Sequence, residues 1–159
     1  MEIRPYRPAD CRQIARLFYS TVHTVCAKDY APRQLNAWAD GKTDLQEWNR
    51  SFLRHRTLVA EENGRIIGFG DITREGYLDR LYVHRSFQGR GVGTALCSRL
   101  EQFAAQAHRI TTHASITARP FFLQRGYHTV RMQWVVRKGV VLNNYLMEKS
   151  TGFSKKPKV

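Results

Sequence analysis

Apolar residues recur along this chain with two different spacings, and the alternation between them predicts strands and helices in one mixed fold. Strand-length apolar or alternating runs lie at residues 1–7, 57–62, 65–73, 77–83, 110–115, 127–138 and 140–147. Spacings of three or four residues, which give a helix one buried face, begin near residues 10, 32, 44, 91 and 117. This order predicts an α/β (α+β) domain with helices flanking a mixed, mostly antiparallel sheet of six to seven strands.

Polar residues and glycines indicate where several of these elements begin and turn. Asp10 and Asp44 are each followed three residues later by Gln or Glu, which is typical of a capping box at a helix start. Asn63-Gly64 and Lys138-Gly139 predict tight turns between successive strands. The fourth helix is expected to run from about residue 91 to residue 108. Its predicted buried stripe consists of Val92, Leu96, Leu100, Phe103 and Ala107.

The sequence Gln88-Gly89-Arg90-Gly91-Val92-Gly93-Thr94, here called the glycine-rich loop, connects the predicted strand 77–83 to this helix. Glycines let a backbone approach a ligand closely, and the first amides of a helix favour negative charge, so the loop is predicted to bind phosphate groups. A P-loop would need a Lys before Thr94, and a dinucleotide-binding loop would need a Gly there and an acid about twenty residues later. The loop fits neither pattern.

With these flanks, the chain resembles the GNAT family of acetyl-CoA-dependent N-acetyltransferases, as a small stand-alone member of the bacterial type. Gln88, Gly91 and Gly93 fill the defined positions of the family's Arg/Gln-x-x-Gly-x-Gly/Ala motif. A later segment is also similar, and it contains Ala118, Phe121-Phe122 and Gly126-Tyr127. The resemblance extends from Thr57 to Val130. Two positions differ, because Ser115 replaces the family's Asn and Phe122 replaces the Tyr that often serves as its general acid.

The resemblance implies that acetyl-CoA is the co-substrate and that no metal is needed. It implies that the loop holds the pyrophosphate, that the strand backbone bonds the pantetheine arm, and that the strand 77–83 splays apart from the parallel strand after the helix. The amide of Val83 would stabilise the oxyanion. The expected coenzyme-binding residues are Leu81, Tyr82, Val83, Gln88, Gly89, Arg90, Gly91, Val92, Gly93, Thr94 and Phe122.

A primary amine is protonated at neutral pH, so a base must remove a proton before the amine can attack a thioester. Asp79 is the leading candidate, because strand alternation places it on the face of Leu81 and Val83. The alternative is a structural ion pair between Asp79 and an arginine. Glu61 and Glu62, acting through water, are further candidates.

The departing thiolate needs a proton or must leave without one. Phe122 has none to give, so Ser115, Tyr77, Tyr127 or water could supply it, although a thiol with a pKa near 8.5 needs little help. Ser115 is therefore included with Asp79 and Val83 in the predicted catalytic set. No serine or cysteine nucleophile with a recognisable base is present, which indicates direct transfer without a covalent enzyme intermediate.

The acceptor amine is not identified by the sequence. Recognition is expected from the segment before Thr57 and from the last two strands, where Asn143-Asn144 lies. Polar and aromatic candidates in the earlier segment are His23, Lys28, Tyr30, Trp38 and Trp48, although Trp38 and Trp48 also have the spacing of core residues.

The length of 159 residues fits one domain, assigned to residues 1–149, followed by a short basic tail at 150–159 that is expected to be flexible. No apolar run is long enough to span a bilayer. Cys11, Cys26 and Cys97 have no disulfide or zinc spacing, so a reducing, cytoplasmic setting is expected, with no metal site.

Lysine and arginine outnumber aspartate and glutamate by 26 to 13, a net charge of +13. The excess could attract coenzyme phosphates, an acidic acceptor or RNA, or serve only solubility. Nucleic acid is the less favoured partner, because no nucleic-acid motif accompanies the charge. Two other functions remain open: a non-catalytic acyl-CoA sensor, and a GNAT enzyme acting on RNA or aminoacyl-tRNA. Monomer and homodimer are both open.

Overall fold

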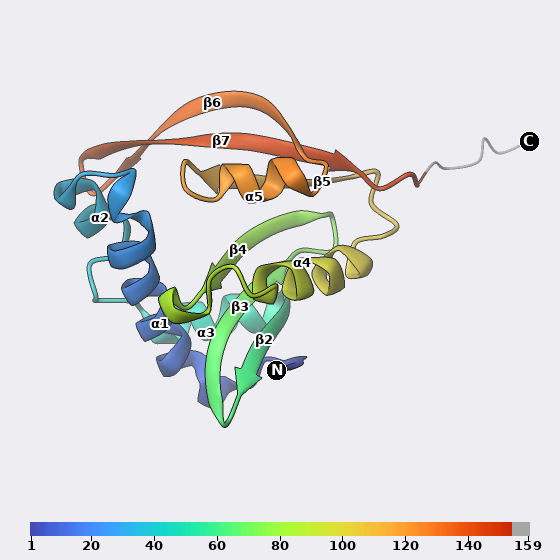
Figure 1. Ribbon diagram of the computed structural model, residues 1–159, viewed down its shortest axis with the longest axis horizontal. Helices are drawn as coiled ribbons and strands as arrows, with labels where there is room; N and C mark the ends of the chain where they lie inside the picture. The colour runs from blue at the N-terminus through green and yellow to red at the C-terminus, as the bar shows by residue number, and fades with distance from the viewer. Residues whose placement is uncertain (154–159) are drawn as a thin grey trace, which may run out of the picture.

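The computed structural model describes residues 1–153, which form seven strands in a single sheet. Along the sheet the strand order is β1-β2-β3-β4-β5-β7-β6 (Figure 1). The strands are β1 (Glu2–Pro5), β2 (Arg56–Glu62), β3 (Arg65–Ile72), β4 (Tyr77–Val83), β5 (Arg109–Ser115), β6 (His128–Arg137) and β7 (Val140–Ser150). The α-helices are α1 (Cys11–Thr24), α2 (Pro32–Trp38), α3 (Leu45–Arg54), α4 (Val92–Phe103) and α5 (Arg119–Gln124). Short 3-10 turns occupy Pro8–Asp10, Val25–Lys28 and Arg85–Phe87.

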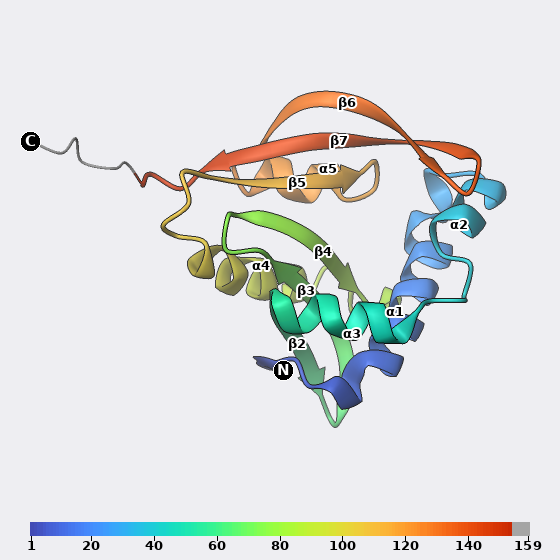
Figure 2. The same ribbon diagram turned by 180° about the vertical axis from the view of Figure 1, so that it is seen from behind.

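All neighbouring strands are antiparallel except β4 and β5, which run parallel. These two strands pair only at Tyr77 with Thr111 and at Leu78 with Thr112, and then they separate. Figures 1 and 2 show β4 curving away from β5, so that the sheet opens between β1–β4 and β5–β7. The mixed sheet and the splayed parallel pair confirm the predicted fold class.

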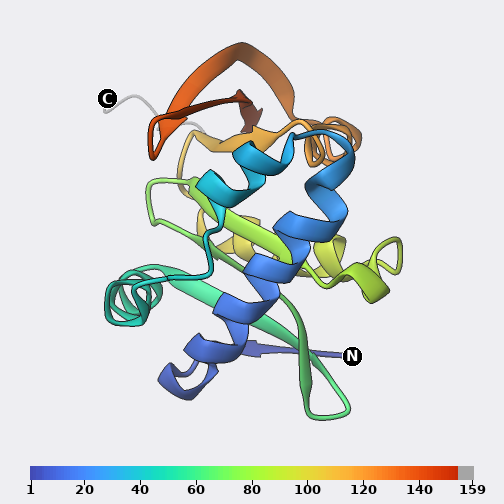
Figure 3. The same cartoon turned by 90° about the vertical axis from the view of Figure 1, so that its left-hand side faces the viewer.

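Helices cover both faces of the sheet, and each face has its own apolar core. Helix α4 packs on β2, β3 and β4, whereas α1 and α3 lie on the opposite face (Figures 1 and 2). Helix α1 runs across the foreground of Figure 3 and leads to α2 beside β7. Phe18, Phe52 and Phe69 belong to the α1–α3 core, and Leu96 and Leu100 belong to the α4 core.

The predicted strand turns are present. Asn63 and Gly64 both have positive φ, 51° and 75°, and Lys138 and Gly139 have φ of 48° and 75°. Two consecutive residues with positive φ match the right-handed twist of a hairpin, and Asn and Gly adopt this conformation at low cost.

Helix α4 ends earlier than its apolar spacing predicts. It stops at Phe103 rather than His108, and the Phe103 ring is 48% exposed with the Arg56 guanidinium 3.8 Å from its centroid. Ala104, which is 1% exposed, fills the buried position instead. The apolar spacing of the sequence extends beyond the helix into the turn residues 104–108. The helix ends before them because the chain must turn there to reach β5, which begins at Arg109.

Asp10 does not cap α1 as predicted. A 3-10 turn leads directly into the helix, and the Asp10 carboxylate accepts the Arg7 amide at 2.8 Å and pairs with Arg4 Nη1 at 2.9 Å. The second predicted cap is confirmed, because the Asp44 carboxylate accepts the amides at the start of α3.

The last strand is longer than expected. Strand β7 continues through Ser150, and the Thr151 amide donates to the His108 carbonyl at 3.2 Å. The predicted boundary after residue 149 therefore falls inside an ordered strand, and residues 154–159 of the predicted tail lie outside the described residues. Within residues 1–153, no helix combines the length and apolarity needed to cross a membrane.

Candidate active site

A cavity of about 390 Å³, here called the loop cavity, opens where β4 leaves β5. Its walls come from the end of β4, the glycine-rich loop, the start of α4, α5 and part of α1. Ten of the eleven residues predicted to bind the coenzyme line it: Leu81, Tyr82, Val83, Gln88, Gly89, Gly91, Val92, Gly93, Thr94 and Phe122. Arg90 does not line the cavity, and its guanidinium lies 5.2 Å from the Phe87 ring.

The loop geometry requires its glycines. Gly89 and Gly91 have φ of +72° and +81°, a region that other residues enter at a cost, and Gly91 is the N-cap of α4. In the part of the chain that the structure describes, no atom lies within 4 Å of a Cβ added at Gly91, so the constraint there is backbone conformation and not crowding. The unpaired amides of the first turn of α4 therefore face a cavity suited to a phosphate group.

The free edge of β4 presents backbone groups to the same cavity. The Val83 carbonyl accepts hydrogen bonds from Gln88 Nε2 at 2.7 Å and Thr21 Oγ1 at 3.2 Å, so it points away from β3. The N–H and C=O of one strand residue point to the same side, so the amides of Val83 and Leu81 also face the gap. The Tyr82 carbonyl oxygen would lie 3.2 Å from a Cβ built at Gly68, so this carbonyl points toward β3. Tyr82 therefore lines the cavity with its side chain and not with its backbone polar groups.

Asp79 lies on a different face from the one that simple alternation predicts. Asp71 pairs with Arg80 and Ile72 with Leu78, so Asp79 is an extra residue in a β-bulge. The bulge restores Leu78 and Leu81 to the α4 face and turns Asp79 toward the cavity that Tyr82 also lines. This irregularity depends on the partner strand, so β4 alone could not reveal it.

That second cavity, of about 330 Å³, is here called the aromatic cavity, and it lies between β4, β5, the β6–β7 hairpin and helices α1 to α3. Its aromatic wall consists of Phe18, Tyr30, Trp38, Trp48, Tyr77 and Tyr82. Its polar residues are Asp79, Arg80, His113, Ser115, Arg137, Asn143 and Asn144. Trp38 and Trp48 are thus partly buried cavity residues as well as packing residues.

The two cavities meet at the point where β4 and β5 diverge. Tyr82 and Ser115 line both of them, and a small space of about 60 Å³ between them is bordered by Asp79, Ser115 and Phe122. Ser115 Oγ accepts the Ala118 amide at 3.0 Å, which fixes the oxygen and leaves the hydroxyl proton free to donate.

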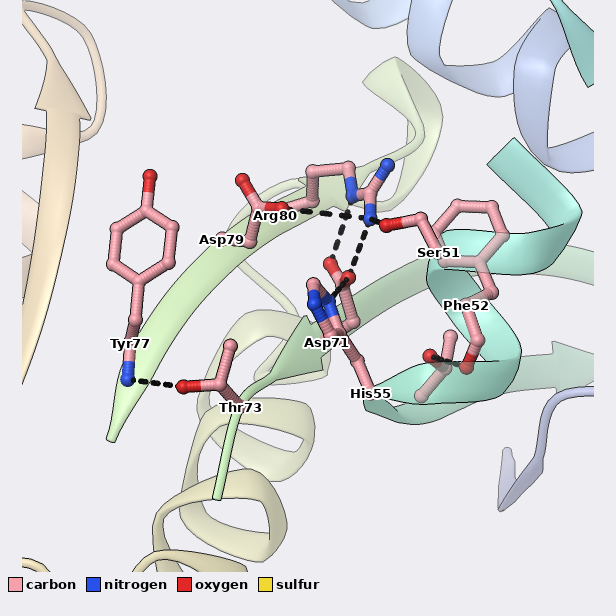
Figure 4. A network of polar contacts seen from close by, with 9 residues as sticks. Ser51, Phe52, His55, Asp71, Thr73, Tyr77, Asp79 and Arg80 are labelled. Atoms are coloured by element: carbon pink, nitrogen blue, oxygen red, sulfur yellow. Dashed lines mark hydrogen bonds and ion pairs between the residues drawn. The ribbon is translucent and has the colours of Figure 1, made fainter. Parts of the chain in front are cut away.

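A buried ionic network supports this region from the β3 side (Figure 4). The Asp71 side chain has no exposed area, and it accepts from Arg80 Nε at 2.9 Å through Oδ1 and from Arg80 Nη2 at 2.6 Å through Oδ2. His55 Nδ1 lies 2.7 Å from the same Oδ2. Arg80 Nη2 also donates to Ser51 Oγ at 2.6 Å. The sequence did not identify this network, although an acid inside the apolar strand at residues 65–73 signals a buried partner.

The environment of Asp79 makes its charged form less favourable than it is in water. Burial and then the neighbouring Asp71 carboxylate raise the pKa of Asp79, and Arg80 Nη2, 3.5 Å away, only partly opposes them. The side chain is 32% exposed, so it can still exchange protons with solvent or a ligand. Asp79 therefore forms an ion pair with Arg80, and its carboxylate is also accessible from the aromatic cavity.

His113 is a site residue that the sequence did not single out. It lies on β5 in the aromatic cavity, and its Nδ1 is 2.6 Å from Gln133 Nε2. Burial and then the charge of Arg131 lower the pKa of His113, so the ring is neutral at physiological pH. Burial likewise raises the pKa of Tyr77, which shares this cavity, to about 12.

Several other predicted candidates lie away from both cavities. Glu61 pairs with Arg4 at 2.6 Å, and Glu62 lies 3.8 Å from the N-terminal amine. The Tyr127 hydroxyl is buried in the α4 core and lines neither cavity, and burial strongly raises its pKa.

His23 and Lys28, named as acceptor candidates, also line neither cavity. The His23 ring contacts the Ala39 carbonyl at 2.7 Å. Tyr30 does line the aromatic cavity, but its hydroxyl donates to the Asn143 carbonyl at 2.8 Å, so that group also ties the helical segment to β7.

His55, Asp71 and Asp79 each place one potential metal-ligand atom within 4.8 Å of the others. Arg80 occupies both Asp71 oxygens in the same cluster. A cation at this position would face the guanidinium, so the arrangement fits an ion-paired network better than a metal site.

Comparison with known proteins agrees with this geometry. The family described as Acetyltransferase (GNAT) domain matches residues 26–149. The uncharacterized N-acetyltransferase YafP of Escherichia coli (strain K12) is 34% identical over 148 residues, covering 92% of this chain and 94% of that protein.

Solved structures give the same result. A protein from Rhodopseudomonas palustris, named GCN5-related N-acetyltransferase: aminotransferase, class-II, superposes with a TM-score of 0.90 at 34% identity over 94% of both chains. The yncA protein of Salmonella typhimurium, solved with acetyl-CoA, shares the fold at a TM-score of 0.74 and 22% identity, covering 99% and 98% of the two chains. The chain therefore belongs to the GNAT family of acetyltransferases.

Proposed function

We propose that this protein transfers the acetyl group of acetyl-CoA directly to a primary amine held in the aromatic cavity. The observation that carries the proposal is the meeting of two cavities at Tyr82 and Ser115. One cavity has a phosphate-binding loop, and the other has a carboxylate. A donor and an acceptor bound in them would bring their reactive groups to the same point, which is the main requirement of direct transfer.

The loop cavity fits the coenzyme in two parts. The amides of the glycine-rich loop and the first turn of α4 would bind the pyrophosphate, and Arg90 adds positive charge beside them. Among residues 1–153, the edge of β4 from Leu81 to Val83 has no strand partner on the β5 side, so it can pair with the amide groups of the pantetheine arm. Acetyl-CoA supplies the activated acetyl group, and Phe122 packs in the wall of the cavity.

Asp79 acts in this proposal as the base that takes the proton of the bound ammonium group. Its pKa is raised by burial and by Asp71, which makes it a stronger proton acceptor than a fully solvated carboxylate. The Arg80–Asp71 pair holds the neighbouring backbone in place. The Val83 amide, directed into the gap, would donate to the thioester oxygen as negative charge grows there.

Ser115 is the proposed hydrogen-bond donor to the departing sulfur, which leaves as the thiolate and can take its proton from water, so Ser115 keeps its own proton. It lies at the junction, and its hydroxyl proton is not used by the bond from the Ala118 amide. Phe122 occupies the position that often carries a donor in the family. A thiol pKa near 8.5 means that the contribution of Ser115 is small in comparison with that of the base.

The proposal is tested by acetyl-CoA binding and by turnover. Isothermal titration should show acetyl-CoA binding to the wild type, and Gly91→Val should abolish it. Gly64→Val is the matched control, because Gly64 has a similar φ of +75°, equally open surroundings and a position in the β2–β3 turn away from the cavity. Acetyl transfer is then measured as the release of the free coenzyme A thiol in the presence of each of a panel of amines. A folded wild type that fails to bind acetyl-CoA would refute the proposal.

Binding without turnover of any amine would favour the acyl-CoA sensor instead, for which the loss of the usual donor at Phe122 is the supporting feature. An acetyl-CoA-dependent reaction suits the cytoplasm. The three cysteines are buried and unpaired, which agrees with a reducing compartment, so we assign the protein to that compartment.

A further inference from the structure

The charges in the aromatic cavity do not balance. The cavity contains one carboxylate, Asp79, and two guanidinium groups, Arg80 and Arg137. Arg80 is already neutralised by the buried Asp71 at 2.6 Å and lies 3.5 Å from Asp79. Arg137 has no carboxylate within 4.0 Å among residues 1–153, so it is the cation of this cavity that lacks a protein counterion there.

Strand alternation explains why Arg137 lies on the cavity side of β6, where it lines the cavity while the residue itself stays exposed to solvent. Side chains alternate along β6, and Val135 and Arg137 line the cavity, whereas Trp134 and Val136 on the other face are 66% and 65% exposed. Gln133, on the inward face, contacts His113 of β5. Arg137 is therefore presented to the cavity by the regular pleat of the hairpin, close to the turn at residues 138 and 139.

Arg80 offers a second donor in the same space. Its Nε and Nη2 are bonded to Asp71 and Ser51, and Nη1 has no hydrogen-bond partner among the described residues. Figure 4 shows the free end of the guanidinium on the same side of β4 as the Tyr77 hydroxyl and an Asp79 oxygen. The cavity thus combines one site for an ammonium group with donors for an anion.

We propose that the acceptor is a free amino acid, with its amine at Asp79, its carboxylate at Arg137 and an apolar or aromatic side chain against Trp38 and Trp48. This inference rests on the proposed transferase function and names its substrate class. A cavity of about 330 Å³ has the size of a small-molecule site. A polyamine would bring its second positive charge toward two guanidinium groups, which disfavours it.

Three probes with the same aromatic group test the carboxylate: L-phenylalanine, L-phenylalaninamide and phenethylamine. The amide keeps the shape without the charge, and phenethylamine lacks the group. We expect kcat/KM for L-phenylalanine to exceed that for either analogue by about tenfold or more, as hydrogen bonds to charged groups imply. L-Leucine should be acetylated and putrescine should not. Equal rates for the three probes, or a preference for putrescine, would overturn the inference.

The Arg137→Gln variant identifies the residue responsible. It should lower kcat/KM for L-phenylalanine by about tenfold or more and leave that for phenethylamine within about threefold. Arg131→Gln is the matched control, because it removes the same charge from the same strand at a residue outside the cavity lining. The control should change neither rate by more than about threefold. An equal loss with both substrates in Arg137→Gln would refute the carboxylate contact.

The two proposals fail in distinguishable ways. Loss of acetyl-CoA binding, or turnover of no amine, would refute the transferase function itself. Turnover of amines with no preference for the carboxylate would refute only the amino acid acceptor. Acetyl-CoA titration and thermal unfolding of both arginine variants should match the wild type. If Arg137→Gln alone lowered Tm, Arg137→Lys would separate a loss of stability from a loss of the carboxylate contact. The lysine keeps the positive charge, so this variant should restore part of the preference for L-phenylalanine over phenethylamine.

Discussion

Asp79 shows how a single side chain acquires catalytic properties from its neighbours. The bulge in β4 directs it into the aromatic cavity, burial and the nearby Asp71 raise its pKa, and Arg80 partly opposes that rise. The carboxylate therefore combines cavity access with a raised pKa. Both properties depend on residues of β3, and neither can be read from β4 alone.

We predict that Asp79→Asn lowers kcat/KM for the amine by about 10²–10⁴-fold, the usual contribution of a general base, without weakening acetyl-CoA binding. In the wild type kcat/KM should rise with pH through the pKa of Asp79, which lies above its ordinary value of 3.8, because only the deprotonated carboxylate accepts a proton. This rise should be absent from the variant. Glu75→Gln, at an exposed acid in the turn before β4, is the control. An unchanged pH profile in Asp79→Asn would exclude Asp79 as the base.

At the scale of elements, the approach of α4 to β3 sets the position of the glycine-rich loop. A Cβ on Gly70 would lie 2.9 Å from both Leu100 Cδ1 and the Arg80 carbonyl, so only glycine allows this spacing. At Gly93, in the first turn of α4, a Cβ would be 3.5 Å from the Phe121 ring, an ordinary contact distance. Gly70 therefore allows α4 to pack closely on β3, and Gly93 keeps the loop cavity open.

These two glycines should respond differently to the same substitution. We predict that Gly70→Ala lowers the free energy of unfolding by about 1–3 kcal/mol through overpacking, as measured by urea denaturation. Gly93→Ala should leave stability unchanged or raise it slightly, because alanine favours helices, yet it should weaken acetyl-CoA binding. If Gly93→Ala were the more destabilising substitution, the assignment of the two roles would be wrong.

Glu101 joins three elements at the other end of α4. It pairs with Arg125 after α5 and with Lys149 of β7 at 2.9 Å, and only 12% of its side chain is exposed. Burial raises the pKa of Glu101, but hydrogen bonds from Arg125 and Lys149 outweigh burial, so its pKa lies below the ordinary 4.5. Its contribution to stability is therefore present above pH 4.5 and is lost as pH falls through the lowered pKa.

We predict that Glu101→Gln reduces the free energy of unfolding by about 2 kcal/mol at neutral pH, because two cations lose a buried partner. The difference from the wild type should shrink below pH 4.5. Urea denaturation as a function of pH measures this difference. Glu2→Gln, at an exposed position of β1, should show no such dependence. A constant difference at every pH would indicate a packing effect instead.

Most local features of the chain were predictable, although the cap at Asp10 was not, and features that depend on strand register were missed. The glycine-rich loop, the cap at Asp44 and the strand turns depend on neighbouring residues, and the structure contains them. The face of Asp79 depends on register with β3, and the exposure of Phe103 depends on where β5 begins. His113 enters the site because β5 separates from β4, which no residue of β5 encodes by itself.

For the whole molecule, the active site lies at the division of the sheet. The β1–β4 part with α4 builds the loop cavity, and the β5–β7 part with α2 closes the aromatic cavity. Each cavity uses residues from both parts, so the splay itself creates the site. The whole chain carries a formal charge of +13, and the coenzyme that it is proposed to bind carries several negative phosphate charges.

We predict that this charge attracts acetyl-CoA over long range, so kcat/KM for acetyl-CoA should fall severalfold between about 0.05 and about 0.5 M NaCl. Removing residues 154–159 deletes Lys155, Lys156 and Lys158 and lowers the charge from +13 to +10, so most of the field remains. The truncated protein should therefore keep the same salt dependence, measured at saturating amine. A flat salt profile after truncation would assign the attraction to those three lysines instead of the folded domain.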